Sequence, residues 1–143
     1  MNDTALALRL LLFCFEHLPY PLCPRAIPDI EIDPDLDAEG RIEFGFLTTI
    51  KLRAWDGSAY WQSVLCHETA HYVQAMNGVT FSDTRKTERE ALSAQVSWLI
   101  KINAPIEAYP TEKIIHALTG NRIPHGADRR SWPSLSTKRK SND

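Results

Sequence analysis

A helical pattern of hydrophobic and polar positions runs through residues 59–77, which contain neither proline nor glycine. Asp56 and Gly57 are a turn signal before it, Ser58 is a suitable N-cap, and Gly78 is a suitable stop. Positions spaced by three, four and seven residues share one face of such a helix. That face carries Val64, His67, His71, Gln74 and Ala75. The pattern therefore predicts a helix whose two histidines lie on the side that Val64 and Ala75 would bury.

A second helical pattern covers residues 85–102, with Asp83 or Thr84 as a suitable N-cap. On a helical wheel, Glu88 shares its side with one amide and several apolar residues. These lie within about 60° of it and are Ala91, Leu92, Gln95, Leu99 and Ile102. Glu90 lies nearly opposite, which predicts a solvated charge. The wheel therefore places Glu88 on the buried face of this helix.

The connection between the two predicted helices is the short segment 78–83. A connection of this length predicts a helical hairpin, which would bring Glu88 back toward His71. The run Asn103-Ala104-Pro105 is expected to end the second helix.

The N-terminal pattern predicts a helix over residues 4–18, which Pro19 ends, and the prolines that follow predict an extended linker. Arg9 and Glu16 bracket far fewer apolar residues than the ~20 that cross a bilayer. Asp3 stands where a signal peptide carries basic residues. We therefore expect neither a membrane span nor an exported chain.

A small β region is expected between the linker and the histidine helix. Residues 27–32 predict a short strand, and residues 33–40 an acidic loop. Residues 41–52 alternate, with Ile42, Phe44 and Phe46 on one side. This stretch is either one extended strand or two strands, the second over residues 48–52.

The C-terminal part is expected to hold one more helix, from Pro110 or Thr111 to Gly120. Residues 126–143 are polar, basic and without periodicity, which indicates a disordered tail. Residues 1–125 are then a single domain. The fold class expected from all elements is α+β, mostly helical, with a short β region before the histidine helix.

Composition narrows the function classes only slightly. The chain has 143 residues, 43% of them hydrophobic, and a net charge of −2. This balance offers no electrostatic attraction to nucleic acid or to an anionic membrane. The cysteines Cys14, Cys23 and Cys66 show no metal-type spacing and are odd in number. Reduced thiols fit a cytoplasmic protein, and we expect Cys66 to be a small buried hydrophobe.

Candidate chemistry lies in His67-Glu68-Thr69-Ala70-His71, which reads H-E-x-x-H. Residues four apart lie above one another on a helix, so His67 and His71 can bind one metal ion. Glu68 is rotated by about 100° and can reach a water on that metal without binding the ion itself. This arrangement is typical of a zinc hydrolase in which the glutamate is the general base.

A third ligand is needed, because catalytic zinc usually keeps three protein ligands and one open position. Glu88 is the candidate, since a carboxylate on a buried helix face requires a partner. The alternatives are an ion pair of Glu88 with Arg53 or Lys101, and Glu90 as the third ligand instead.

These motifs, the H-E-x-x-H followed by Glu88-Arg89-Glu90-Ala91, resemble a minimal gluzincin metallopeptidase over residues 41–102. The chain is also similar to small bacterial zincin-like proteins with a Gln three residues after the second histidine, here Gln74, and more distantly to the ImmA/IrrE type of metalloprotease. The resemblance implies a small zincin-like fold, Glu88 as the third zinc ligand, a peptide or protein substrate, and a sheet edge that pairs with it. Many gluzincins carry Asp or Asn four residues after the ligand Glu, where this chain has Leu92.

Three hypotheses follow for the function. The first is a zinc peptidase or amidase that uses Zn²⁺ and Glu68. The second is a zinc-stabilised regulatory or interaction protein of the same fold, and the third a metal-free helical domain. The donor to a developing oxyanion stays open among Tyr60, Tyr72, Tyr109, His116 and His125. The sequence indicates no oligomeric state.

Overall fold

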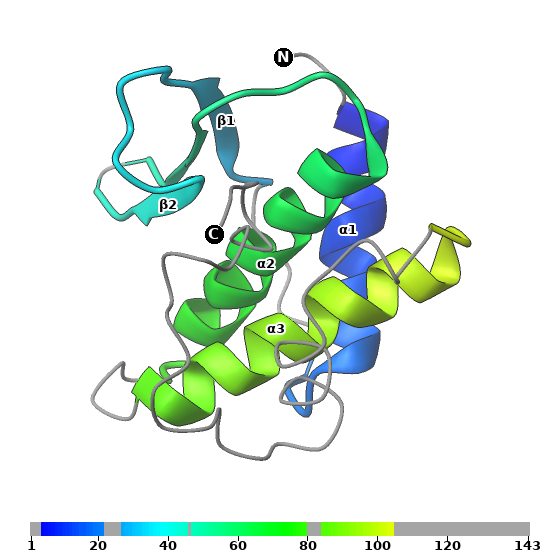
Figure 1. Cartoon of the computed structure of the whole chain (residues 1–143). Coiled ribbons are helices and arrows are strands. Elements are labelled where there is room, and N and C mark those ends of the chain that lie inside the picture. Colours follow the sequence, from blue (N-terminus) through cyan, green and yellow to red (C-terminus); the bar gives the residue numbers. More distant parts are fainter. Residues whose placement is uncertain (1–3, 22–26, 46, 80–83, 105–143) are drawn as a thin grey trace, which may run out of the picture.

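The computed structural model describes residues 4–21, 27–45, 47–79 and 84–104. Its elements are α1 (Thr4–His17), β1 (Asp29–Ile32), β2 (Gly40–Glu43), β3 (Thr49–Leu52), α2 (Ala59–Met76) and α3 (Thr84–Lys101). This confirms the predicted α+β class. In Figure 1, α2 runs through the middle of the molecule between the sheet and α1, and α3 crosses both helices.

The core forms around α2, which contacts α1, α3, β2 and β3. Nearly every side chain from Ser63 to Gln74 is buried. Burial therefore extends beyond the predicted stripe, to Leu65, Cys66 and Val73, each fully buried. A helix that is covered on several sides needs no polar face. The expectation that Cys66 is a buried hydrophobe is confirmed.

Both ends of α2 are closed as the sequence predicts. The Ser58 hydroxyl accepts a hydrogen bond from the Trp61 backbone N–H at 3.4 Å. Gly78 adopts a positive φ of 74°, and the Val79 N–H donates to the Gln74 carbonyl at 3.0 Å. Glycine adopts this left-handed conformation without steric cost, so the chain can leave α2 sharply and enter α3.

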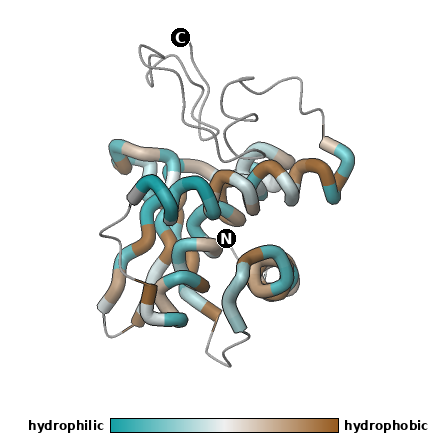
Figure 2. The backbone as a smooth tube through the Cα atoms, turned by 90° about the horizontal axis from the view of Figure 1, so that it is seen from below, coloured by the Kyte–Doolittle hydropathy of each residue, from teal (hydrophilic) through white to brown (hydrophobic). Residues whose placement is uncertain are grey.

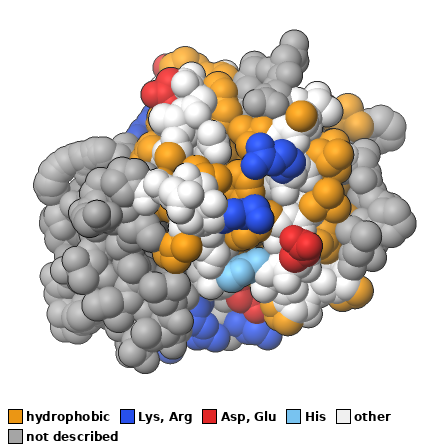
Figure 3. All heavy atoms as spheres, turned by 90° about the vertical axis from the view of Figure 1, so that its right-hand side faces the viewer, with side chains coloured by type: hydrophobic (Ala, Val, Ile, Leu, Met, Phe, Trp, Pro, Cys, Tyr) orange, Lys and Arg blue, Asp and Glu red, His pale blue; other side chains and the backbone are white. Residues whose placement is uncertain are grey.

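The helix α3 changes character along its length. Figure 2 shows hydrophilic residues in its first turns and hydrophobic residues gathered in its second half. There Trp98, 1% exposed, packs edge-on against Phe13 of α1 with ring centroids 5.2 Å apart. Lys and Arg side chains lie among hydrophobic ones on the face in Figure 3, and the Arg9 guanidinium lies 5.5 Å from the Trp98 ring centroid. This contact covers the seam between α1 and α3.

The sheet has the order β1-β3-β2, with β1 parallel and β2 antiparallel to β3. All three strands contribute side chains to the core: Ile50 and Leu52 of the central strand are fully buried, and Ile30 of β1 and Ile42 of β2 pack against the core partly buried. Residues 40–52 thus form two strands. The predicted alternation does not reach Phe44, which follows β2 and is 54% exposed. The chain reverses between β2 and β3, so Phe44 lies outside the pairing of the two strands and does not reach the core.

Several predictions concern residues that the structure does not describe. These are Phe46, Cys23, the helix expected to end at Gly120, the domain boundary after residue 125 and the tail over residues 126–143. In the described ranges, no helix combines the length and the apolar character needed to cross a bilayer.

Candidate metal centre

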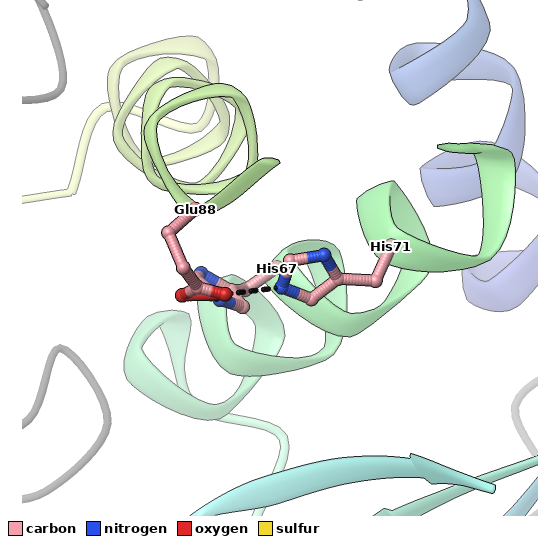
Figure 4. Close-up of side chains that lie close together, drawn as sticks. All are labelled: His67, His71 and Glu88. Atoms are coloured by element: carbon pink, nitrogen blue, oxygen red, sulfur yellow. Dashed lines mark hydrogen bonds and ion pairs between the residues drawn. The ribbon is translucent and has the colours of Figure 1, made fainter. Parts of the chain in front are cut away.

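Two helices bring the three predicted ligands together. His67 and His71 project from α2, and Glu88 projects from α3 toward them (Figure 4). The Glu88 carboxylate oxygens lie 3.2 Å from His67 Nε2 and 2.7 Å from His71 Nε2. One ligand atom from each residue lies within 4.8 Å of the others, so this group could hold a metal ion.

Local sequence explains this convergence. The histidines are one helical turn apart, and their ring centroids are 4.9 Å apart. The hairpin between α2 and α3 then lays the buried face of α3 over them, as the wheel and the short connection predict. Glu88 extends from that face, and its side chain keeps 45% exposure. The centre therefore reaches solvent on the Glu88 side.

The alternative ion pairs of Glu88 are wrong. Arg53 lies 3.6 Å from the carboxylate of Glu39, and the Lys101 amine lies over the Phe13 ring. Glu88 contacts the two histidines instead, because the hairpin sets it opposite them.

The orientation of His67 is set by an amide on α3. Its Nδ1–H donates to Gln95 Oε1 at 2.9 Å, since an amide oxygen can only accept. The Gln95 amide nitrogen donates to the Ser63 hydroxyl at 3.2 Å, and that hydroxyl donates to the Tyr60 carbonyl at 2.6 Å. This relay fixes the imidazole so that Nε2 is directed toward Glu88.

The orientation of His71 is set in the same way from its own helix. Its Nδ1–H donates to Gln74 Oε1 at 2.9 Å. The Gln74 amide nitrogen donates to Glu90 Oε1 at 2.9 Å and to the Thr87 carbonyl at 3.1 Å. Because both acceptors face the amide nitrogen of Gln74, its amide oxygen is the atom that faces His71. Fully buried Gln74 thus ties the two helices together at the centre.

Glu90 is part of this relay, and the expectation of a solvated charge is wrong. It accepts hydrogen bonds from Gln74 and, at 2.7 Å, from the Tyr20 hydroxyl. Burial and then Glu90 raise the pKa of Tyr20 to about 12, so the phenol stays a donor. The helical wheel gave the wrong environment for Glu90 because it does not include other segments of the chain. Tyr20, from the segment after α1, covers the side of α3 that carries Glu90.

The hydrogen bond that Leu92 cannot make is supplied elsewhere. Leu92 is buried and has no polar group, whereas Gln95 Oε1, three residues further along α3, accepts the hydrogen bond from His67 Nδ1–H. Sequence reasoning placed Gln95 on the inward face but gave it no function. A buried amide requires partners, and that signal could have linked it to His67.

The charges of the metal-free centre are strongly coupled. Burial lowers the pKa of His71, but the hydrogen bond and charge of Glu88, with Glu68 and Gln74, outweigh it and raise this pKa to about 9. Burial raises the pKa of Glu88, and the two histidines outweigh it, so the pKa lies well below its usual range. The Glu88 carboxylate therefore favours the protonated form of the His71 imidazole.

Glu68 is the buried carboxylate beside the ligands, with 8% exposure. Burial raises its pKa, and the nearby charges of His67, His71 and Arg41 oppose this shift. A carboxylate with a raised pKa is a better proton acceptor near neutral pH than an ordinary glutamate.

The candidate oxyanion donors are only partly located. The Tyr60 hydroxyl donates to Glu39 Oε2 at 2.5 Å, and Tyr72 is buried in the core. Tyr109, His116 and His125 lie outside the described residues.

We expect Glu90→Ala to weaken zinc binding by about tenfold, because Gln74 loses one of its two acceptors and holds His71 less firmly. Glu90→Gln keeps an acceptor oxygen and should bind zinc nearly as the wild type does. Competition with a chromophoric chelator measures both, and Glu16→Ala, an exposed glutamate on α1, is the control. Equal loss in the Ala and Gln variants would contradict the relay.

Zinc affinity should rise with pH between 7 and 9, by about tenfold per unit for one proton released. The reason is that His71, whose pKa is about 9 in the metal-free protein, must lose its proton before Nε2 can bind a metal. Titration calorimetry in buffers of different ionisation enthalpy measures the proton release. An affinity that is independent of pH over this interval would contradict the ion pair of His71 with Glu88.

Comparison of the chain with family models, with curated proteins and with solved structures found no match.

Proposed function

We propose that the chain is a zinc-dependent hydrolase of peptide or amide bonds, of the small zincin-like type that its motifs resemble. His67, His71 and Glu88 would hold Zn²⁺, and Glu68 would be the general base. The observation that carries the proposal is that one ligand atom from each of these three residues lies within 4.8 Å of the others. Glu68, the glutamate of the H-E-x-x-H motif, directly follows His67 in the sequence.

The donor set fits zinc. Two imidazole nitrogens and one carboxylate are common zinc ligands in hydrolases. Both Nδ1 atoms donate to amide oxygens, which leaves the Nε2 atoms for an ion. Three ligands among the described residues leave one position for water or substrate.

The chemistry divides between the ion and the protein. When bound, zinc supplies polarisation of the scissile carbonyl and acidification of water. Glu68 accepts the proton of the attacking water and passes it to the leaving nitrogen. Its burial beside two histidines holds the carboxylate away from bulk solvent, which favours this transfer.

The partner class is a peptide or protein. A net charge of −2 offers no attraction to nucleic acid or to anionic membranes. The three cysteines show neither metal-type spacing nor a disulfide framework, and reduced thiols are typical of a cytoplasmic protein, so we propose that location.

A second candidate is a zinc-stabilised regulatory or interaction protein of the same fold. The observation in its favour is the limited access to the centre. Glu68 is buried, and the side chains of His67 and His71 are 14% and 10% exposed. Such a centre would bind zinc without turnover.

A peptide-library digest tests the proposal. Zinc-loaded protein is incubated with a mixed library, and products are identified by mass spectrometry. We expect cleavage that chelation abolishes and that zinc restores. Zinc binding without any cleavage would favour the second candidate.

A further inference from the structure

The first residue of β2 lies directly against the side chain of Glu68. A Cβ atom built on Gly40 would lie 2.8 Å from Glu68 Cγ and 3.1 Å from Oε2. Real Cβ atoms essentially never lie closer than 3.0 Å to another heavy atom, so the contact with Cγ could not form without a shift. The Glu68 side chain, at its Cγ atom, therefore occupies the space that the Cβ of any other residue at this position would fill.

This glycine is not required by its backbone. Its φ is not positive, unlike those of Gly57 and Gly78, so alanine could adopt the same conformation. The nearest atom is Cγ, close to the main chain of α2, so rotation of the carboxylate alone does not remove the clash. The Glu68 side chain would have to leave its position.

The strand cannot easily move away instead. Gly40 pairs with Leu52 of β3, and the Arg53 N–H donates to the Glu39 carbonyl at 2.8 Å. The Glu39 side chain is 4% exposed and accepts from the Tyr60 hydroxyl at 2.5 Å. Tyr60 belongs to the first turn of α2, so its hydrogen bond to Glu39 joins the helix to the strand one residue before Gly40.

We propose that Gly40 is a positioning residue, whose missing side chain fixes where the Glu68 carboxylate lies beside the two histidines. The steric contact stands on the structure alone, while the importance of that position for catalysis rests on the proposed function.

The experiment is a double-mutant cycle on thermal unfolding of the full chain, with Gly40→Ala made in three backgrounds. We expect the unfolding midpoint to fall by several degrees in the wild type and in Glu68→Gln, which keeps Cγ. In Glu68→Ala, which lacks Cγ, the fall should nearly vanish. Gly45→Ala is the matched control, because its added Cβ would meet no atom closer than 3.7 Å. An equal fall in all three backgrounds, or none in the wild type, overturns the proposal.

Zinc affinity and kinetics complete the test. Gly40→Ala should bind zinc as the wild type does, and its kcat on a cleaved peptide should fall on the order of 100-fold with KM little changed. A wild-type kcat in this variant overturns the positioning role. If no peptide is cleaved by the wild type, the proposed function fails, and the unfolding cycle still decides whether Gly40 positions Glu68.

Discussion

Glu68→Gln is expected to lower kcat for peptide cleavage by about 10²–10⁴-fold and to leave zinc binding unchanged. Glutamine keeps the size of the side chain in its buried position, but it cannot accept a proton from water. Glu68 is also no member of the ligand group His67, His71 and Glu88. Steady-state kinetics and a zinc titration on the same preparation measure both effects.

The outcome separates the two candidate functions. In an enzyme, turnover is lost and zinc is kept. In a zinc-stabilised interaction protein there is no turnover to lose, and the variant should unfold much as the wild type does. Cleavage at the wild-type rate by Glu68→Gln would show that Glu68 is not the base.

Glu88→Ala is expected to weaken zinc binding by more than about 100-fold, beyond the loss that follows from removing an orienting partner of a ligand. The variant keeps both histidines but lacks the carboxylate that completes the candidate group among the described residues. The Glu88 side chain is 45% exposed, so the variant should still fold, although it loses the ion pair with His71. Chelator competition measures the affinity, and circular dichroism checks the fold.

The matched comparison for this variant is Glu90→Ala, two residues along α3. Glu90 is bonded to Gln74 and Tyr20 rather than to the histidines, so its loss should cost far less affinity. If Glu90→Ala lost more affinity than Glu88→Ala, the ligand assignment would be wrong.

The helices were predictable because their signals are local. The Ser58 cap and Gly78 define α2, and the left-handed Asn103 ends α3 as expected. The strand pattern was less reliable, because exposed Phe44 has the same hydropathy as a core residue. Its place depends on where the chain reverses, and this is decided by the pairing of β2 with β3.

The convergence of His67, His71 and Glu88 was predictable because helical spacing places the two histidines on one face and the helical hairpin brings Glu88 opposite them. The supporting residues depend on packing between distant segments. Tyr20 lies 70 residues from Glu90, and the contact of Gly40 with Glu68 joins a strand to a helix. No periodicity in one segment can show such contacts.

The most direct test of the central claim is the zinc content of the purified wild-type chain after incubation with zinc and removal of the excess. Elemental analysis should find about one zinc ion per chain, the stoichiometry of a single site formed by His67, His71 and Glu88. A chain that retains no zinc would contradict the claim, and the H-E-x-x-H would then be a chance pattern on a core helix.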